Sequence, residues 1–337
     1  MISPHLAVFL LSLAGSLALT PLAIRLGKRQ GLVARPGGRR QHDGPVPVTG
    51  SLVIAVSFVL GSILAWTMLP PTGGDIQLLR GVMLGALVIF LGGLFDDRLE
   101  LSHRWLFVIQ IAAAGIAIGH EVFIERFTNP ITSEEVVIEQ FLIYGLLTLF
   151  WMLGMVNTVN FMDGLDGLAV GVGVVAALMF AWHSYNLEQF SVSLFPLALA
   201  GALLGFLPFN FAPAKIFLGS GAYLLGFLLA GFSILAPAKI ATALLVMAVP
   251  IWDIAWQIYS RLRHGRSPFH GDRNHLHFRL ADAGVPTRAI VLAYYAISAA
   301  FGLVAIFAPG VMKLVALSLL TLLLLGVFAW MTRLEVR

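Results

Sequence analysis

The sequence predicts an all-α integral membrane protein with about eleven spanning helices. Hydrophobic residues make up 59% of the 337 residues and charged residues only 11%, whereas soluble globular proteins carry about 25% charged residues. The mean hydropathy is +0.91. Because a bilayer core of ~30 Å needs roughly 20 apolar residues per helix, we expect a polytopic bundle. No connection is long enough for a separate folded unit, so residues 1–337 are expected to form a single transmembrane domain.

Eleven stretches of the sequence have the length and apolar character of a spanning helix. Gly, Pro and charged residues separate them, and our boundaries follow these breaks. The eighth and ninth stretches are divided only by the short turn Ala236-Pro237-Ala238. The first has no basic residue before it and several after it, so we expect a retained span rather than a cleaved signal peptide. The expected spans are 5–25, 48–69, 79–95, 105–119, 138–156, 167–184, 193–210, 221–236, 239–260, 288–308 and 311–331.

The basic residues lie almost entirely on one alternate set of connections between these stretches. With the N-terminus placed outside, seventeen of the 21 Lys and Arg residues fall on the cytoplasmic set, and the exceptions are Arg80, Arg126, Lys239 and Lys313. Cytoplasmic loops of membrane proteins are enriched in Lys and Arg, so the pattern predicts an odd number of spans, with the N-terminus outside and the C-terminus cytoplasmic. Membrane orientation also accounts for the pI near 9.6, and we expect no nucleic-acid partner.

The lack of Cys and the distribution of acidic residues limit the kinds of site that the chain can form. The chain has no Cys, which excludes disulfides, thiolate metal sites and Cys nucleophiles. The outer connection 120–139 carries five Glu residues, and we interpret it as a solvated acidic loop. Chemistry is therefore expected on the cytoplasmic connections, of which 26–47 and 261–287 are the longest.

The first long cytoplasmic loop combines a stiff backbone with positive charge. Residues 35–50 read R-P-G-G-R-R-Q-H-D-G-P-V-P-V-T-G, and the Pro and Gly residues impose an irregular course. Arg39, Arg40 and His42 place positive charge at the level of the lipid headgroups. Two interpretations stay open: the charge sets topology and attracts anionic lipid, or the loop serves a functional site.

Two adjacent carboxylates, Asp96 and Asp97, end the third apolar stretch. A helix C-terminus disfavours negative charge, and an acidic residue beside a membrane segment is costly enough to indicate a purpose. Mg²⁺ takes oxygen ligands from one or two carboxylates together with water and substrate phosphates, so a paired Asp fits a metal–phosphate site. The alternative is a solvated loop in which the carboxylates pair with Arg98 and Arg104.

The connection after the fifth stretch reads N-T-V-N-F-M-D-G-L-D-G-L over residues 157–168. Asn160, Asp163 and Asp166 recur every three residues, so a helix here would gather amide and carboxylate oxygens broadly on one side. The glycine after each acid would let a ligand or another backbone approach closely. An apolar-flanked N-x-x-D-G-x-D-G motif is hard to explain as structure alone, and we interpret it as part of a site.

The last cytoplasmic loop carries histidines beside basic residues. Asp253 lies in the apolar stretch before it, and the loop continues to the H-L-H motif of His275 and His277. Histidines at this spacing could indicate zinc, but Arg273 and Arg279 are unfavourable neighbours for a cation. Hydrogen bonding to an anionic sugar nucleotide suits these charges better.

Together these segments resemble the polyprenyl-phosphate N-acetylhexosamine-1-phosphate transferase family. This is glycosyltransferase family 4, with the WecA, TagO and MraY enzymes, and the S-P-F…D-R-x-H-L-H form is more similar to WecA and TagO. The resemblance covers residues 35–280, nearly the whole chain. The matching elements are R-R-Q-H-x-x-P-x-P-x-x-G, F-D-D-R-L-E-L-S, N-T-V-N-F-M-D-G-L-D-G-L-A, V-P-I-W-D, R-x-R-x-G-R-S-P-F and D-R-N-H-L-H.

The resemblance implies transfer of a HexNAc-1-phosphate, expected to be GlcNAc-1-phosphate, from a UDP-sugar to undecaprenyl phosphate, with release of UMP. It further implies Mg²⁺ or Mn²⁺ as the cofactor, an active site on the cytoplasmic face of the cell inner membrane, and a role in starting a cell-envelope polysaccharide. The partners would be the two substrates and the lipid bilayer, and a homodimer is left open.

Motif positions imply roles for particular residues. The catalytic set would be Asp96, Asp97, Asp163 and Asp166, and the metal ligands would be Asn160 and Asp97. Arg104 stands where the family usually has Lys, near the phosphates. The expected substrate-binding residues are Arg39, His42, Arg104, Asn157, Arg266, Asp272, Arg273, His275, His277 and Arg279.

One departure from the family pattern affects the expected metal site. The family motif reads like F-L-G-D-S-G-S, whereas this chain has F-L-G-S-G-A-Y at 217–223. The simplest alignment deletes the Asp that is expected to bind the metal, and Ser220 either offers a neutral oxygen or caps the following helix. Three hypotheses stand: an active sugar-phosphate transferase, a catalytically impaired member that still binds lipid phosphate or sugar nucleotide, and a transporter or channel of another class.

Overall fold

The computed structural model describes residues 3–34, 44–132, 134–235, 239–265 and 274–335, and over these residues it is almost entirely helical. The helices are α1 (Pro4–Gln30), α2 (Gly50–Met68), α3 (Gly74–Leu99), α4 (His103–Gly119), α5 (Phe141–Met162), α6 (Leu168–Asn186), α7 (Phe190–Asn210), α8 (Gly221–Ile234), α9 (Lys239–Val246), α10 (Ala248–Arg263), α11 (Leu276–Asp282), α12 (Thr287–Phe307) and α13 (Gly310–Glu335). The strands are β1 (Val33–Ala34), β2 (Val46–Pro47), β3 (Arg126–Thr128) and β4 (Glu135–Val137).

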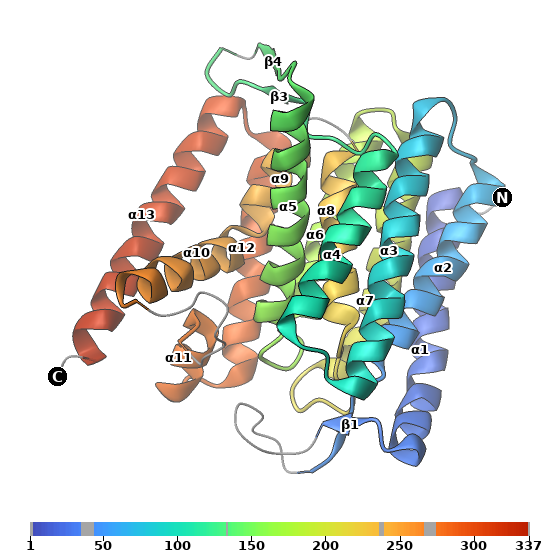
Figure 1. Ribbon diagram of the computed structural model, residues 1–337, viewed down its shortest axis with the longest axis vertical. Helices are drawn as coiled ribbons and strands as arrows, with labels where there is room; N and C mark the ends of the chain where they lie inside the picture. Colours follow the sequence, from blue (N-terminus) through green and yellow to red (C-terminus); the bar gives the residue numbers. More distant parts are fainter. Residues whose placement is uncertain (1–2, 35–43, 133, 236–238, 266–273, 336–337) are drawn as a thin grey trace.

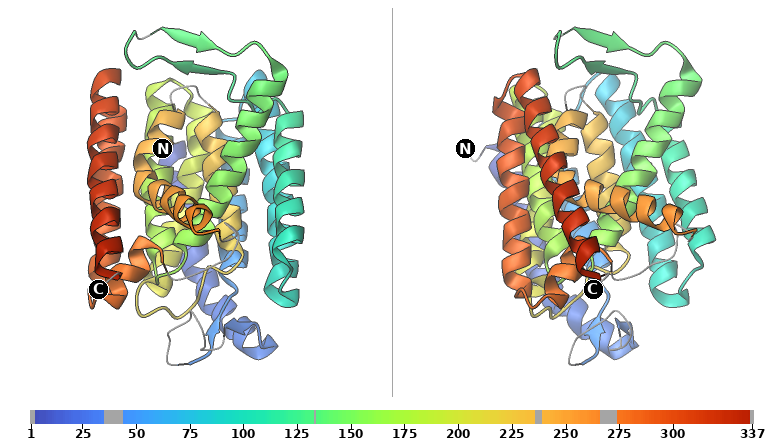
Figure 2. Two further views of the ribbon diagram at one scale, coloured as in Figure 1. Left: turned by 60° about the vertical axis from the view of Figure 1, so that its left-hand side comes forward. Right: turned by 90° about the vertical axis from the view of Figure 1, so that its left-hand side faces the viewer.

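Most of the helices run roughly along one direction and form a bundle (Figures 1 and 2). Helices α6, α7 and α8 are mostly buried within it. The peripheral helices expose large apolar side chains instead, among them Leu22 on α1, Phe150 on α5 and Leu322 on α13. Apolar surface of this extent is unfavourable in water and suits contact with lipid. The chain is therefore a polytopic membrane protein.

Eight helices in the described parts of the chain are long and apolar enough to cross a membrane. They are α1, α2, α3, α5, α6, α7, α12 and α13, and they match eight of the expected spans. The expected spans at 105–119 and 221–236 correspond to the shorter helices α4 and α8, of 17 and 14 residues. The all-helical membrane fold is confirmed, whereas the total of eleven spans and the orientation of the termini remain predictions.

The ninth expected span, 239–260, is not one continuous helix. The structure divides it into α9 and α10, with a bend of 76° between them. Pro250 explains the break, because it has no N–H to donate to the Val246 carbonyl and its ring would clash with that carbonyl in a continuous helix. Helix α10 therefore leaves the bundle direction and crosses toward α13 (Figures 1 and 2), where Trp256 stacks on Phe328 at a ring distance of 5.2 Å.

The break gives α10 a polar face that is buried in the protein. Asp253, Gln257 and Arg261 recur every four residues and are only 3%, 3% and 5% exposed. Residues four apart lie on the same face of a helix, so one face holds all three polar side chains. Apolar residues such as Ile258 and Leu262 are exposed on the rest of the helix.

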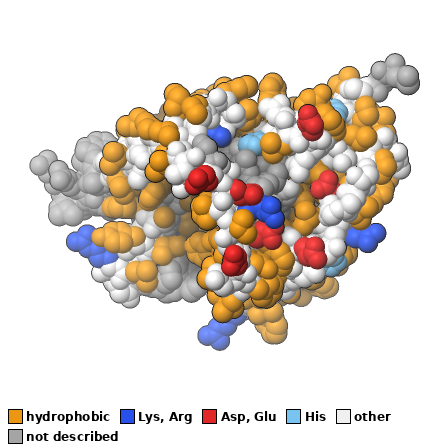
Figure 3. All heavy atoms as spheres, turned by 90° about the horizontal axis from the view of Figure 1, so that it is seen from above, with side chains coloured by type: hydrophobic (Ala, Val, Ile, Leu, Met, Phe, Trp, Pro, Cys, Tyr) orange, Lys and Arg blue, Asp and Glu red, His pale blue; other side chains and the backbone are white. Residues whose placement is uncertain are grey.

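Small sheets mark the two ends of the bundle. Strand β1 pairs antiparallel with β2, with Val33 opposite Pro47, and the Phe217 N–H donates to the Pro47 carbonyl at 2.8 Å. The hairpin of β3 and β4 lies at the opposite end (Figure 1). Figure 3 looks onto the hairpin end, where acidic side chains lie on the surface among hydrophobic ones. This distribution agrees with the solvated acidic loop expected for residues 120–139.

A close contact between α5 and α8 sets the relative position of these two helices. A Cβ added at Gly226 of α8 would lie 2.7 Å from the Val156 Cα and 2.8 Å from the Met155 carbonyl oxygen on α5. Backbone atoms inside a helix cannot move aside as the end of a flexible side chain can. The glycine therefore lets the two helices pack closely, and it fixes the start of α8 relative to the end of α5.

We predict that Gly226→Ala lowers the thermal stability of the detergent-solubilised protein, because overpacking a close contact costs about 1–3 kcal/mol. The melting temperature measured by intrinsic fluorescence tests this. Gly115→Ala on α4 is the matched control, since its added Cβ meets nothing within 4 Å and Ala favours a helix interior over Gly by roughly 0.5–1 kcal/mol. Equal melting temperatures for the two variants would contradict the close-contact interpretation.

Candidate active site

A large cavity of about 2160 Å³ lies at the β1 end of the bundle. Ordinary ligand pockets enclose ~300–1,000 Å³, so this cavity has room for more than one substrate. Segments that are far apart in the sequence contribute polar side chains to it. The predicted site residues that line it are Asp96, Asp97, Asn157, Asn160, Asp163, Asp166 and His275.

The two adjacent carboxylates have different partners. Asp96 Oδ1 accepts a hydrogen bond from the Leu101 N–H at 2.9 Å and so closes the turn after α3. Asp97 accepts from the Ser220 N–H at 2.9 Å, the Ser220 hydroxyl at 2.8 Å and the Ser51 hydroxyl at 3.3 Å. The Asp97 carboxylate thus joins the end of α3 to the starts of α2 and α8.

Ser220 is oriented by Asp97 and not by the helix that it precedes. It is the N-cap residue of α8, but its side chain makes no capping hydrogen bond and its hydroxyl donates to Asp97. The interpretation of Ser220 as a helix cap alone is therefore wrong. Gly219 has a φ of 62°, and an added Cβ would lie 3.1 Å from Asp97 Oδ1, so this close approach requires glycine.

The second acidic segment is only partly helical. Helix α5 ends at Met162, so Asn160 lies in its last turn, whereas Asp163 and Asp166 lie beyond it. The three side chains therefore do not share one helix face, yet all three line the cavity. Asp166 Oδ2 accepts a hydrogen bond from the Ala214 N–H at 2.8 Å, which ties this turn to the loop after α7.

Asp163 lies in an environment that disfavours its charged form. Burial raises the pKa of the Asp163 carboxyl well above its usual range, and the nearby charge of Asp166 raises it further. A carboxylate in such a place is stabilised by a proton or by a neighbouring cation. The Asp163 carboxyl, directly after α5, therefore favours the binding of a proton or a cation in the cavity.

Asn157 and Arg104 differ in how they relate to the cavity. Asn157 Nδ2 donates to the Gln110 side-chain oxygen and to the Leu153 carbonyl, both at 2.8 Å, so it bridges α5 to α4 at the cavity wall. Arg104 is exposed in the first turn of α4 and is not among the residues that line the cavity, whereas its neighbour His103 is. The substrate-binding role of Arg104 stays a prediction that its position does not support.

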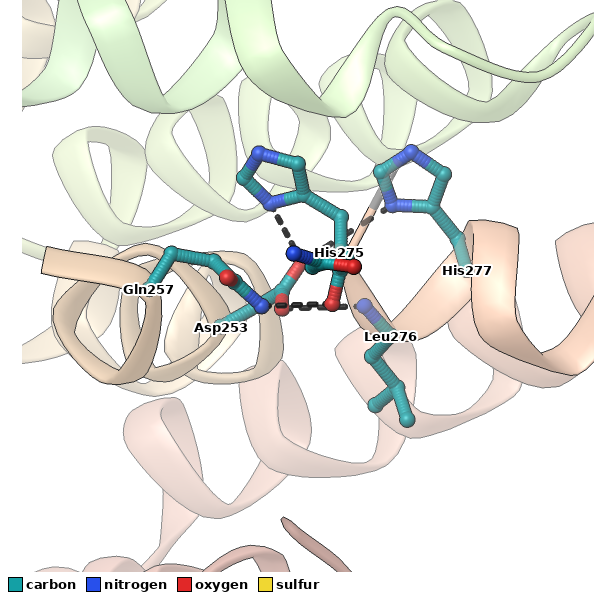
Figure 4. Close-up of polar contacts among 6 residues, drawn as sticks. Asp253, Gln257, His275, Leu276 and His277 are labelled. Carbon is teal, nitrogen blue, oxygen red and sulfur yellow. Dashed lines mark hydrogen bonds and ion pairs between the residues drawn. The ribbon is translucent and has the colours of Figure 1, made fainter. Parts of the chain in front are cut away.

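Asp253 holds the H-L-H segment (Figure 4). Its Oδ1 accepts a hydrogen bond from the Leu276 N–H at 3.0 Å, and its Oδ2 lies 3.1 Å from His275 Nδ1. His277 Nδ1 lies 3.8 Å from the same oxygen. Of the two histidines, His275 lines the large cavity and His277 is buried beside it. The buried face of α10 thus positions the start of α11.

The remaining predicted residues are Arg279 and five residues that the structure does not describe. Arg279 is half-buried on α11 and is not among the lining residues. The predicted roles of these residues stay predictions. Five of them lie outside the described parts of the chain: Arg39, His42, Arg266, Asp272 and Arg273.

The structure also brings polar residues to the cavity that the predicted set omits. Gln257 and Arg261 line it from the buried face of α10, Arg288 from the start of α12 and Tyr223 from α8. The four-residue repeat of polar side chains in an apolar segment was a signal that could have identified the two α10 residues. Arg288 and Tyr223 carry no such local signal, because their place at the cavity depends on how distant helices pack.

Part of the cavity wall is apolar. Phe107 of α4, Phe150 and Trp151 of α5, and Ile254 and Ile258 of α10 contribute to it. The same cavity is lined by the acidic ends of α3 and α5. A space with these two kinds of wall suits an amphiphilic ligand that has a hydrocarbon chain and a charged headgroup.

Oxygen ligands for a divalent cation are present without a preformed cage. Within the described ranges, no group of three or more His, Asp or Glu side chains is placed to hold a metal ion. Asp97 Oδ2 accepts two hydrogen bonds and Oδ1 one, which leaves an Oδ1 lone pair for a cation, and Asn160 lines the same cavity. Because Mg²⁺ is typically held by one or two carboxylates plus substrate phosphates and water, this set fits a cation that binds together with its substrate.

Known proteins with similar sequences act on polyprenyl phosphates, according to their names. Over 305 residues, 88% of this chain and 83% of the relative, the chain is 31% identical to the probable undecaprenyl-phosphate N-acetylglucosaminyl 1-phosphate transferase of Bacillus subtilis (strain 168). Over 301 residues, 80% of this chain and 74% of the relative, it is 35% identical to the decaprenyl-phosphate N-acetylglucosaminephosphotransferase of Mycobacterium tuberculosis (strain ATCC 25618 / H37Rv). Over 281 residues, 79% of this chain and 73% of the relative, it is 29% identical to the undecaprenyl-phosphate alpha-N-acetylglucosaminyl 1-phosphate transferase of Escherichia coli (strain K12).

A family model gives the same assignment. The model described as Glycosyl transferase family 4 matches residues 79–237, a range that contains Asp97, Asn160 and Ser220. The relatives extend the similarity over most of the chain. The chain therefore belongs to the polyprenyl-phosphate N-acetylhexosamine-1-phosphate transferases of glycosyltransferase family 4, and it is a phosphoglycosyltransferase.

Proposed function

We propose that the enzyme transfers GlcNAc-1-phosphate from UDP-GlcNAc to undecaprenyl phosphate on the cytoplasmic side of the inner membrane. An oxygen of the lipid phosphate attacks the sugar-bearing phosphorus, and the bond from that phosphorus to the oxygen of UMP breaks. The products are undecaprenyl-pyrophosphate-GlcNAc, which starts a cell-envelope polysaccharide, and UMP. The observation that carries the proposal is the single cavity in which the acidic ends of α3 and α5 adjoin an apolar wall.

The apolar wall supports a polyprenyl acceptor. Phe150 and Ile258 face the same space as Asp97 and Asn160, so a lipid could place its hydrocarbon against α5 and α10 while its phosphate reaches the acidic end. Each buried CH₂ group contributes roughly 0.8 kcal/mol, so a long polyprenyl chain gains much binding energy from such a wall. The sugar nucleotide would occupy the polar remainder of the cavity.

The main obstacle to the reaction is the approach of one polyanion to another. A phosphate monoester has a second pKa near 6, so the lipid phosphate is largely dianionic at neutral pH and needs no strong general base. Mg²⁺ or Mn²⁺ offsets this repulsion when bound, and Asp97 and Asn160 are the residues that would hold it. Arg261 and Arg288 line the cavity and add fixed positive charge near the phosphates.

The other acids that line the cavity make different contacts, and we assign them different roles. Asp96 and Asp166 each accept a backbone N–H from a neighbouring loop, so their first role is to hold the turns that form the site. Asp163, whose buried carboxyl favours a proton or a cation, is the acid best placed to respond to metal binding. Removal of a proton from the lipid phosphate is a secondary role for this group of acids.

A substitution of Asp97 tests the proposed reaction. With UDP-GlcNAc labelled at the sugar-bearing phosphate, undecaprenyl phosphate and Mg²⁺, we expect the label to appear in a lipid product and unlabelled UMP to be released. Asp97→Asn should reduce this transfer at least about 100-fold, because it removes a charge from the proposed cation site. Glu139→Gln, at an exposed position before α5, is the control and should transfer normally. Label that stays with the nucleotide in the parent enzyme would reject the proposal.

A pH series tests the state of Asp163. Its raised pKa means that the folded protein is destabilised most at pH values above that pKa, and that this cost decreases as the pH falls and disappears near the ordinary carboxyl pKa of about 4. In metal-free buffer, Asp163→Asn should therefore melt at a higher temperature than the parent at pH 8, and the difference should shrink toward pH 5. Transfer should nevertheless be lost. A stability difference that grows as pH falls would contradict this account.

A second candidate function has a specific observation in its favour. The family pattern has a metal-binding acid directly before the position of Ser220, which this chain lacks, and both donors of Ser220 are directed to Asp97. A protein with this feature could bind lipid phosphate or sugar nucleotide without turnover. Binding of UDP-GlcNAc with no lipid product under any Mg²⁺ or Mn²⁺ concentration would favour this candidate over the transferase.

Position 220 itself can be tested through the response to metal. Ser220→Asp would place a second carboxylate beside Asp97, where like charges repel unless a cation bridges them. We expect it to melt below the parent in EDTA and to gain more thermal stability from Mg²⁺ than the parent does. Ser220→Ala, which removes only the hydroxyl donor, should show no enhanced response. Identical Mg²⁺ responses in all three proteins would show that position 220 lies out of reach of the cation.

A further inference from the structure

Asp253 is a buried acid that the proposed chemistry does not use directly. It lies on α10, is 3% exposed, and has separate partners for its two oxygens. Oδ1 accepts the Leu276 N–H at the start of α11, while Oδ2 lies 3.1 Å from His275 Nδ1 (Figure 4). Burying a charge is unfavourable unless such donors satisfy it, so both contacts constrain the Asp253 carboxylate.

We propose that Asp253 is a positioning residue that fixes the tautomer and orientation of His275, so that His275 Nε2 is the ring nitrogen offered to the sugar nucleotide. The inference rests on the proposed function, because His275 lines the cavity assigned to that substrate. A carboxylate only accepts hydrogen bonds, so the hydrogen between Asp253 and His275 is on Nδ1. Nε2 is then left to accept a hydrogen bond from the substrate or, in the charged ring, to donate one to a phosphate oxygen.

Ring contacts hold His275 in this orientation. Phe161, directly after Asn160 on α5, lies against the His275 ring at a centroid distance of 5.4 Å and an interplanar angle of 25°. The His277 ring lies 5.6 Å from that of His275 at 15°. Through Phe161, these nearly parallel rings place His275, the partner of Asp253, against the acidic end of α5, where the phosphates are expected.

The H-L-H segment has another anchor that does not involve the His275 ring. Gln257, one turn from Asp253 on α10, donates to the Asn274 carbonyl at 2.5 Å. Asp253 also anchors backbone, through Leu276. Loss of Gln257 therefore removes a backbone anchor without touching the His275 ring, and it serves as a comparison for Asp253.

The tautomer of His275 can be measured directly by ¹⁵N NMR of histidine-labelled protein in micelles, with His275→Asn to assign the signal. In Asp253→Asn the amide oxygen can still accept from Leu276, but the NH₂ group faces His275 Nδ1 and must donate to it. We expect the hydrogen on the neutral ring to move from Nδ1 to Nε2. An unchanged tautomer would overturn the proposal, and this measurement does not depend on which substrate the enzyme uses.

A double-mutant cycle tests the consequence for function. Asp253→Asn should lower kcat/KM for UDP-GlcNAc roughly 10- to 100-fold, the usual effect of removing a partner that orients a ligand-binding histidine. In the His275→Asn background, which retains a donor near the Nδ1 position, the same change should cost less than about 2-fold, because Asp253 acts through His275. Gln257→Leu is the matched control, and its loss should persist in both backgrounds.

The outcomes separate ring positioning from backbone anchoring. Equal losses from Asp253→Asn in the parent and in the His275→Asn background would mean that Asp253 only anchors α11, and the proposal would be wrong. If the parent enzyme does not transfer GlcNAc-1-phosphate, the proposed function fails, and the NMR tautomer then decides the Asp253–His275 pairing by itself.

Discussion

The contact between Asp97 and Ser220 is the interaction on which the cavity at the β1 end of the bundle depends. An ionised carboxylate at the C-terminus of α3 is unfavourable, but it meets the N–H and hydroxyl of Ser220 at the N-terminus of α8, where the helix dipole favours negative charge. Two glycines make the approach possible. A Cβ at Gly93, one turn before Asp97, would lie 2.7 Å from the Ser220 hydroxyl, and Gly219 has a positive φ. The carboxylate and its donors therefore require the close packing of α3 against α8, and this packing shapes the cavity beside them.

The break at Pro250 has an equally direct consequence for the site. Charged side chains inside a bilayer are costly unless they face a polar interior, and α10 carries Asp253, within the expected span 239–260, and Arg261, directly after it. The turned helix buries both against the cavity and the H-L-H segment. Ile254 and Ile258 of the same helix line the apolar part of the cavity. One short helix thus lines the cavity with both apolar and charged side chains.

The sequence predicted those features that have a local signal. The apolar stretches gave the membrane class, and Asp96, Asp97 and the 157–168 segment stood out because polar residues are rare in their surroundings. The bend at Pro250 was missed because hydropathy along α9 and α10 does not register a change of direction. Arg104, expected near the phosphates from its motif position, is not among the residues that line the cavity, whereas Arg288 lines it without a local signal because its place depends on tertiary packing. The partner of Ser220 lies 123 residues away on another helix, so the sequence alone could suggest capping but not the bond to Asp97.

The missing acid between Gly219 and Ser220 changes how a cation would be held without removing the need for one. The proposed substrates, a lipid phosphate and a UDP-sugar, would bring about two negative charges each near neutral pH, and Asp96, Asp97 and Asp166 add carboxylates to the cavity. Among the described residues, Arg98, Arg261 and Arg288 line the cavity, and their positive charge is smaller than this total. With Asp97 retaining a free lone pair on Oδ1, most oxygen ligands must come from substrate phosphates and water. In the proposed reaction, the cation and the nucleotide sugar should therefore bind cooperatively, because the cation offsets the negative charge of the phosphates and the phosphates supply oxygen ligands to the cation.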